Sequence, residues 1–172
     1  SINHNITVSG IISANNQESI FSTEGITITS INVQKGKNVK VGDVLFTLNK
    51  EEIEEKISSL ENELSNKEKT LSRAVEDYNI ALKKEDKNIQ KALETMENSK
   101  KELDEFNENS LLSKEELINA YEENKKAYEE AVSNKDSNLI SYKRAIEDAN
   151  YDKEKEKLIE NINDLKGILN ND

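Results

Sequence analysis

The sequence has no cysteine, no proline and no tryptophan, and only 5 of its 172 residues are glycine. Without cysteine the chain has no disulfide framework, no thiol nucleophile and no thiolate ligand for a metal. It also lacks the long apolar run that spans a bilayer. Lys and Arg number 24 against 35 Asp and Glu, which gives a net charge of −11. This balance argues against nucleic acid as a partner, because that binding depends on cations neutralising phosphates.

Glycine and charge are distributed unevenly along the chain. Four of the five glycines lie in residues 1–48, and neither glycine nor proline occurs between Gly42 and Gly167. Turns depend on these residues, so the long stretch has almost no turns. The charges of residues 1–48 balance, and the negative excess therefore lies in residues 49–172. Two different architectures meet near Asn49.

Residues 1–48 have the composition of short β-strands. β-Branched and apolar residues alternate with polar ones in six runs, which are Ile6–Val8, Ile11–Ile12, Ile20–Phe21, Ile26–Ile28, Ile31–Val33 and Val44–Leu48. Such alternation between turn residues predicts strands. Gly25 is expected to mark a turn, and two further close turns are expected at Gly36 and Gly42. About 40 residues are few for an independent core.

A long helix is predicted from residue 49 to residue 106. Asn49 is a candidate N-cap, and Glu52, three residues on, is a candidate to reach back to it as in a capping box. Apolar residues then recur at steps of three and four, from Ile53 to Phe106, between Glu, Lys, Asn and Ser. A stripe this narrow is typical of a coiled-coil seam.

A second apolar stripe follows a break near residues 107–113. Ser113 and Glu116 have capping-box spacing and predict a new helix start. The stripe continues to Ile168, and Gly167 together with Asn170 and Asn171 is expected to end the helix. Two arms of equal length on either side of one break predict an antiparallel hairpin.

The register of this hairpin follows from the positions of the apolar residues. Facing residues in an antiparallel pair have numbers with a constant sum, and eleven apolar pairs here share a sum of about 221, as in Leu82 with Leu139. Polar residues interrupt the seam where Lys67 falls opposite Glu154, Glu85 opposite Lys135 or Asp136, and Lys100 opposite Tyr121. A polar seam position fixes register at a cost in stability; a hinge is the alternative role.

The β segment carries a motif with regular spacing. Its positions are Val33, Gly36, Val39, Gly42, Asp43, Leu45 and Leu48. This pattern resembles the half-motif of biotinyl/lipoyl domains. With a helical hairpin directly after it, the chain resembles the periplasmic adaptor, or membrane fusion protein, family (HlyD-like and MacA-like), in which a hairpin separates the two halves of a lipoyl domain. The segment Val8–Ile12 is also similar to the opening strand of that family.

The resemblance implies an α+β fold, with a long antiparallel two-helix coiled coil attached to a small β half-motif of biotinyl/lipoyl type. Residues 1–48 would be the first half of a split lipoyl-like domain, and residues 49–172 the hairpin with its tip near 107–113. The second half is expected after Asp172. An unpaired half-sandwich leaves edge strands and an apolar face open, so we expect this half to pair with another chain or to be poorly ordered.

The function that the resemblance implies is that of a non-catalytic adaptor in a bacterial export or efflux system, of ABC type, with the hairpin as a rigid spacer and assembly element. Its expected partners are a permease in the inner or cytoplasmic membrane and further copies of itself, commonly six in a ring. The expected location is extracytoplasmic, with a membrane anchor outside this chain. Lys outnumbers Arg and Asn is abundant, which hints at an AT-rich, Gram-positive bacterium and its cell surface.

The chain departs from the related motifs at the cofactor-attachment position and at the hairpin tip. The lysine that carries biotin or lipoate is replaced by Glu52, so no cofactor is expected. Adaptors that dock on an outer-membrane channel carry Arg, Leu and Ser at the tip, where this chain has Glu102, Phe106 and Ser113. Ser113 is fully explained as a helix cap.

The partner-binding residues expected at the tip are Phe106, Leu111, Leu112 and Ser113. Apolar residues at a loop apex are candidates for partner contact. The alternative is that Leu111 and Leu112 only close the end of the hairpin.

The sequence has no nucleophile triad, P-loop or dinucleotide fingerprint, and His4 is its only histidine. The acidic clusters are interleaved with lysine as on a solvated helix face. We therefore expect no enzyme, no cofactor and no metal. A structural or cell-surface interaction coiled coil without a transporter is the main alternative function, and a carboxyl-carrier domain is a weaker one.

Overall fold

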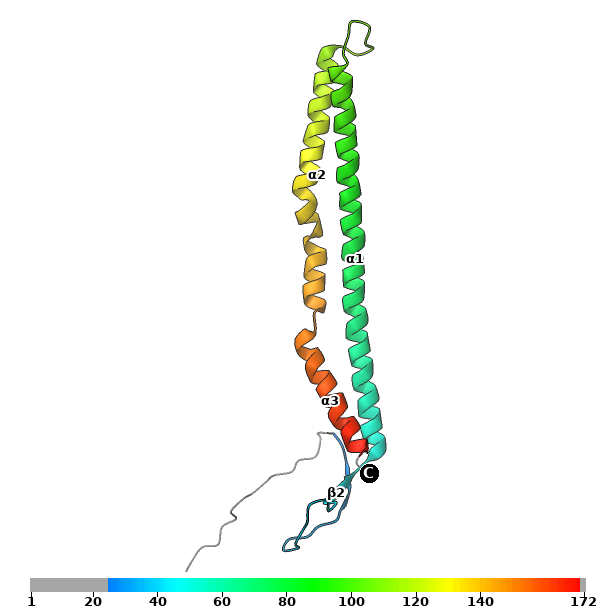
Figure 1. Cartoon of the computed structure of the whole chain (residues 1–172), viewed down its shortest axis with the longest axis vertical. Helices are drawn as coiled ribbons and strands as arrows, with labels where there is room; N and C mark the ends of the chain where they lie inside the picture. The colour runs from blue at the N-terminus through cyan, green and yellow to red at the C-terminus, as the bar shows by residue number, and fades with distance from the viewer. Residues whose placement is uncertain (1–24, 171–172) are drawn as a thin grey trace, which may run out of the picture. The chain divides into compact units, whose positions relative to one another are not determined.

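The computed structural model describes residues 25–170. The strands predicted before residue 25, the opening-strand segment among them, lie outside the described residues. The elements are β1 (Ile28–Ile31), β2 (Phe46–Leu48), α1 (Lys50–Asp104), α2 (Lys114–Ala149) and α3 (Asp152–Asn170), which are coloured along the chain in Figure 1. The chain divides into two compact units, Ser1–Glu55 and Lys56–Asp172.

The first unit contains a two-stranded antiparallel sheet. Ile28 pairs with Leu48 and Ile31 with Phe46, and the register shifts between Ile28 and Ser30. The two runs predicted as strands at Ile26–Ile28 and Ile31–Val33 are therefore wrong as separate strands, because β1 lies across the gap between them. β2 lies within the predicted run from Val44 to Leu48.

Two tight turns connect these strands, as predicted. The Lys37 N–H donates to the Gln34 carbonyl at 3.1 Å, and the Asp43 N–H donates to the Lys40 carbonyl at 3.1 Å. Gly36 (φ 88°) and Gly42 (φ 97°) supply the left-handed conformation that other residues rarely adopt.

The start of α1 is capped as predicted, but Glu52 has a different role. The Asn49 Oδ1 accepts the N–H groups of Glu51 at 3.1 Å and Glu52 at 3.3 Å. The Glu52 carboxylate accepts the N–H of Thr27 at 2.6 Å and its hydroxyl at 2.9 Å. The prediction that Glu52 reaches back to the cap is therefore wrong, because Thr27 supplies two donors at short range.

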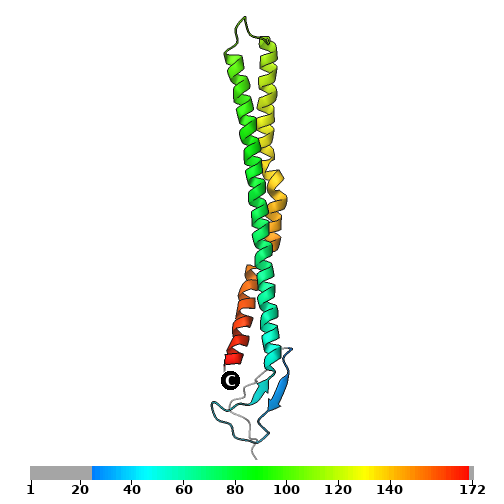
Figure 2. The ribbon, with the colours of Figure 1, turned by 90° about the vertical axis from the view of Figure 1, so that its right-hand side faces the viewer.

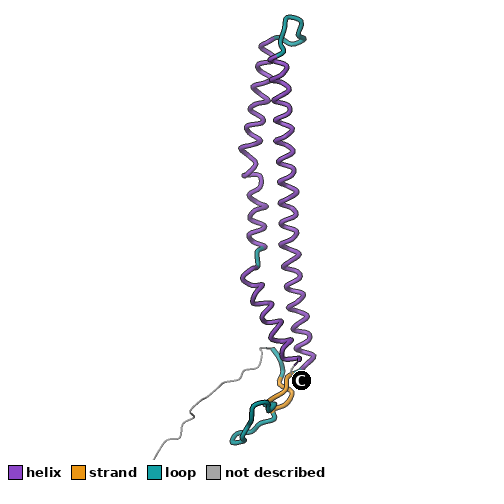
Figure 3. The backbone as a smooth tube through the Cα atoms, viewed as in Figure 1, coloured by secondary structure: helices purple, strands orange, loops and turns teal. Residues whose placement is uncertain are grey.

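The second unit is a long helical hairpin. From residue 56 onward α1 forms one arm, and α2 followed by α3 returns antiparallel to it, as the tube in Figure 3 shows. In the view of Figure 2, α2 and α3 lie on opposite sides of α1. The returning arm therefore winds around the first arm, as expected for a coiled-coil seam.

The hairpin is held by a narrow apolar seam. Its buried apolar residues are Ile57, Leu117, Leu139, Tyr151, Leu158, Ile162 and Leu165, with Leu139 only 1% exposed. The Lys67 Nζ lies 2.6 Å from the Glu154 Oε2, which confirms the predicted pairing at this level. Charged side chains on the exposed helix faces surround this seam.

The returning arm is not one helix, contrary to the prediction. α2 ends at Ala149 and α3 begins at Asp152, with the cap residue Asn150 extended at φ −68° and ψ 123°. The Asn150 Oδ1 accepts the N–H of Asp152 at 2.9 Å and so starts α3. α3 ends at Asn170, as predicted, but the prediction that Gly167 also ends it is wrong, because the helix continues through Gly167.

The cause of this break is present in the spacing of the apolar residues. Ile146 and Tyr151 are five residues apart, whereas Val75 and Leu71, predicted to face them, are four apart. At 3.6 residues per turn, a fifth residue in a continuous helix would lie about 140° from the first around the axis. The break absorbs the extra residue and leaves Tyr151 buried.

Candidate partner-binding surfaces

The hairpin tip is an ordered loop rather than a bare connection. α1 ends at Asp104, and the Asn107 N–H then donates to the Ser110 Oγ at 3.0 Å. The Ser110 N–H returns a bond to the Asn107 carbonyl at 3.0 Å, and the Asn109 N–H donates to the Asn107 Oδ1 at 2.9 Å. Asn107 therefore organises the loop that was predicted as the tip.

The apolar residues predicted for the tip are largely exposed. Leu111 has 104% of its reference exposure, and Phe106 and Leu112 are also exposed. Leu117, which the structure buries, fills the seam below them. A hollow of about 350 Å³ at the tip is lined by Glu102, Glu105, Ser110, Leu111, Leu112 and Leu117. Leu111 does not close the hairpin end; it is presented to solvent.

Ser113 is engaged in the helix start. Its Oγ accepts the N–H of Glu116 at 3.2 Å, and the Glu116 carboxylate accepts the N–H and hydroxyl of Ser113, both at 2.8 Å. This is the predicted capping box, and it is confirmed. The hydrogen bonds from the Ser113 backbone and side chain lower the pKa of the Glu116 carboxyl.

Replacing Ser113 by Ala is expected to lower the free energy of unfolding by about 1 kcal/mol, because the N-cap bond is lost. The lowered pKa of Glu116 means that its contribution is present above the ordinary value of 4.5 and lost as the pH falls through the lower folded-state value. Urea unfolding at pH 7 and at pH 3 tests both statements. The difference between wild type and Ser113→Ala should shrink at pH 3.

Ser133→Ala is the matched control for this prediction. The Ser133 hydroxyl donates to the Glu130 carbonyl within α2. Removal of this hydroxyl should change the free energy of unfolding little. An equal loss in both variants, or a Ser113→Ala effect that does not depend on pH, would contradict the capping-box account.

The residues predicted to form a lipoyl-like half-motif lie around the two turns of the first unit. Val33 and Leu45 are half-buried, whereas Val39 is exposed. The Asp43 Oδ2 accepts the N–H of Lys40 at 2.8 Å and stabilises the second turn. Val41, at 107% of its reference exposure, leaves the apolar side of this loop open.

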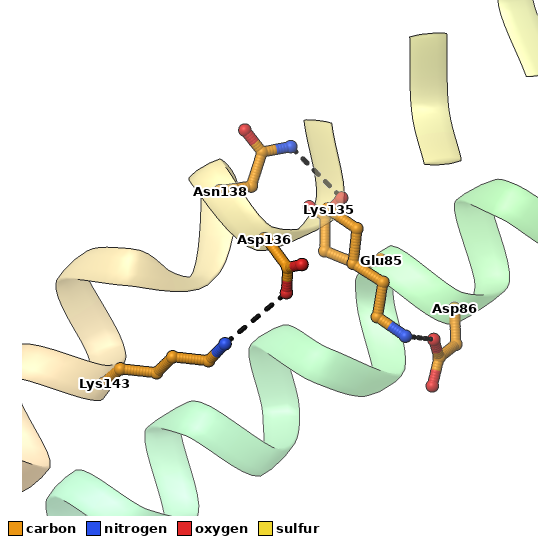
Figure 4. A network of polar contacts seen from close by, with 6 residues as sticks. All are labelled: Glu85, Asp86, Lys135, Asp136, Asn138 and Lys143. Atoms are coloured by element: carbon orange, nitrogen blue, oxygen red, sulfur yellow. Dashed lines mark hydrogen bonds and ion pairs between the residues drawn. The ribbon is translucent and has the colours of Figure 1, made fainter. Parts of the chain in front are cut away.

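A polar layer crosses the middle of the hairpin (Figure 4). The Lys135 Nζ lies 2.6 Å from the Asp86 Oδ1, and the Asn138 amide donates to Glu85 at 3.1 Å. The numbers of Lys135 and Asp86 sum to 221, which agrees with the predicted register. The predicted partner of Glu85 is wrong, because Glu85 bonds to Asn138 rather than to Lys135 or Asp136. The hydrogen bond with Asp86 raises the pKa of Lys135.

The two other predicted polar seam positions, Lys67 and Lys100, form different kinds of ion pair. The hydrogen bond with Glu154 raises the pKa of Lys67, which links the two arms. Lys100 instead pairs with Asp104 of its own helix at 2.7 Å. Its pKa is raised mainly by Asp104, with a smaller effect from Tyr121.

Across residues 25–170 no group of three or more His, Cys, Asp or Glu side chains is arranged to hold a metal ion. None of the described helices is long and apolar enough to cross a membrane.

No protein-family model matches the chain, and no curated protein or solved structure matches it either. The exposed loop of the first unit and the hairpin tip are the candidate partner-binding surfaces.

Proposed function

We propose that this chain is part of a non-catalytic adaptor subunit of a bacterial export system, of ABC type, with a β half-motif of lipoyl kind. The observation that carries the proposal is the order of parts. A loop with two glycine turns and exposed valines is followed, after the short strand β2 and a single capping residue, by a helix of 55 residues that forms one arm of an antiparallel hairpin.

The hairpin acts as a stiff spacer in this proposal. A helix of 55 residues is about 80 Å long at 1.5 Å per residue. The seam and the ion pairs at Lys67–Glu154 and Lys135–Asp86 hold the second arm against it in one register. Such a rod holds its tip at a fixed distance from its base, where a partner can contact Leu111 and Leu112.

The first unit supplies the assembly end of the adaptor. Ile31 of β1 and Val41 and Val44 of the loop between the strands are exposed, and a two-stranded sheet with exposed apolar residues needs cover from other strands. In the proposed adaptor a second lipoyl half covers this face, and neighbouring copies form a ring. Glu52 is occupied by its two bonds to Thr27 and offers no amine for a swinging arm, which fits an assembly role without a cofactor.

A structural or cell-surface coiled coil without a transporter is the second candidate. The observation that favours it is the acidic residue Glu102 beside the tip hollow, where channel-docking adaptors carry Arg. The tip of this chain would then bind a different partner, and the hairpin would need no permease.

The two candidates are separated by co-purification with the permease and ATPase of an ABC-type exporter from the same organism. The complete protein, co-expressed with both in a membrane preparation, is expected to purify with the permease and to give a ring of several copies by native mass spectrometry. A Leu111→Ser/Leu112→Ser variant is the control, and it should retain the permease because the tip lies at the far end of the hairpin. A monomer that never purifies with the permease would contradict the adaptor function and favour the coiled-coil alternative.

A further inference from the structure

The first unit carries opposite charges on two separate segments. The lysine–valine loop, defined here as residues 35–41, holds Lys35, Lys37 and Lys40 and no carboxylate. The glutamate patch, defined here as Glu51, Glu54 and Glu55, lies on the first turns of α1 and is exposed. Among the described residues, none of the ion pairs joins the loop to the patch.

The lysine–valine loop combines exposed apolar and cationic side chains with a fixed backbone, as a binding loop does. Val39 and Val41 are exposed between the lysines, so an apolar centre has a cationic rim. The turns closed by Gln34–Lys37 and Lys40–Asp43 fix the loop backbone, which reduces the entropy lost on binding. Asp43, the nearest carboxylate after the loop, is occupied by the Lys40 N–H.

We propose that the lysine–valine loop of one copy of this chain binds the glutamate patch of the next copy. The occupant is chosen by charge complementarity, because the same unit carries an anionic surface that forms no ion pair with another described residue and fits the cationic loop. Loop and patch are different surfaces, so the contact is heterologous, and heterologous contacts repeat around a closed ring when the rotation closes. The proposal rests on the ring of the proposed function and names the surface that builds it.

Reciprocal charge reversal tests this contact. Lys35→Glu/Lys40→Glu makes the loop acidic, and Glu54→Lys/Glu55→Lys makes the patch basic. Each variant alone is expected to self-associate at least about tenfold more weakly than wild type in sedimentation equilibrium, since both surfaces then carry the same sign. An equimolar mixture of the two variants should recover association, because each variant offers the surface that complements the other.

Matched controls keep the net charge equal to that of each variant. Lys87→Glu/Lys91→Glu and Glu76→Lys/Glu160→Lys change exposed side chains of the hairpin that form no ion pair among the described residues. These controls should associate like wild type within about twofold. Circular dichroism of all variants should show the helical content of wild type, so that a folding defect is separated from an interface defect.

Several outcomes would overturn the contact. A wild-type chain that stays monomeric, a mixture that fails to recover association, or controls that weaken it equally would each do so. Binding of the wild-type loop to anionic phosphatidylglycerol vesicles without self-association would assign the loop to a lipid surface instead. If the complete protein still forms a ring with the permease when loop and patch are reversed, the contact is wrong while the adaptor function stands.

Discussion

Deletion of Asn150 is expected to join α2 and α3 into one continuous helix without loss of stability. The deletion brings Ile146 and Tyr151 to a spacing of four, which equals the spacing of Val75 and Leu71 on the first arm. Both side chains then lie on one stripe of an unbroken helix, and the backbone groups at the break gain helical partners. Helical content measured by circular dichroism should rise slightly, and the urea midpoint should stay the same or increase.

Deletion of Asn161 is the matched control, because it removes the same residue type from within α3. It turns Ile162 and Leu165, both buried, about 100° away from the seam. The free energy of unfolding should fall by several kcal/mol, since truncating one such side chain alone costs about 2–5 kcal/mol. If the two deletions are equally damaging, the extra residue is not the cause of the break.

Leu139→Ala is expected to be the most damaging single substitution in the middle of the hairpin. Leu139 is 1% exposed and is the most completely buried large side chain of the described residues. Truncation leaves a cavity in a seam that has few buried neighbours, with an expected cost of about 2–5 kcal/mol. Thermal and urea unfolding of the 172-residue chain measures this cost.

Ile140→Ala provides the comparison at the adjacent position. Ile140 is 49% exposed and points away from the seam, so its truncation should change the free energy of unfolding by about 0.5 kcal/mol or less. Similar losses for Leu139→Ala and Ile140→Ala would mean that the seam does not lie where the structure places it.

The hairpin and its caps were predictable because their causes are local or periodic. Asn49 and Ser113 are capping residues at the expected positions, and the apolar stripe carries the antiparallel register tested by Lys67 and Glu154. The break at Asn150 was also encoded, as a five-residue step between apolar residues. A pattern that includes only steps of three and four does not reveal this five-residue step.

The first unit was less predictable because its contacts join distant residues. The pairing of Glu52 with Thr27 spans 25 positions and competes with the local bond to the cap. The limits of β1 depend on which of several Ile-rich runs pairs with β2, and alternation alone does not decide this. The exposure of Leu111 at the tip likewise follows from the loop bonds of Asn107, which no periodic pattern describes.

The contacts between the two arms differ greatly in the length of chain that they enclose. The pair of Lys135 with Asp86 spans 49 positions, whereas the pair of Lys166 with Glu61 spans 105. Loop closure is least costly for short loops, so the arms are expected to zip from the tip toward the base. The capping box at Ser113 starts α2 beside the tip, so we expect it to form early, and Ser113→Ala should slow refolding in stopped-flow measurements more than it speeds unfolding.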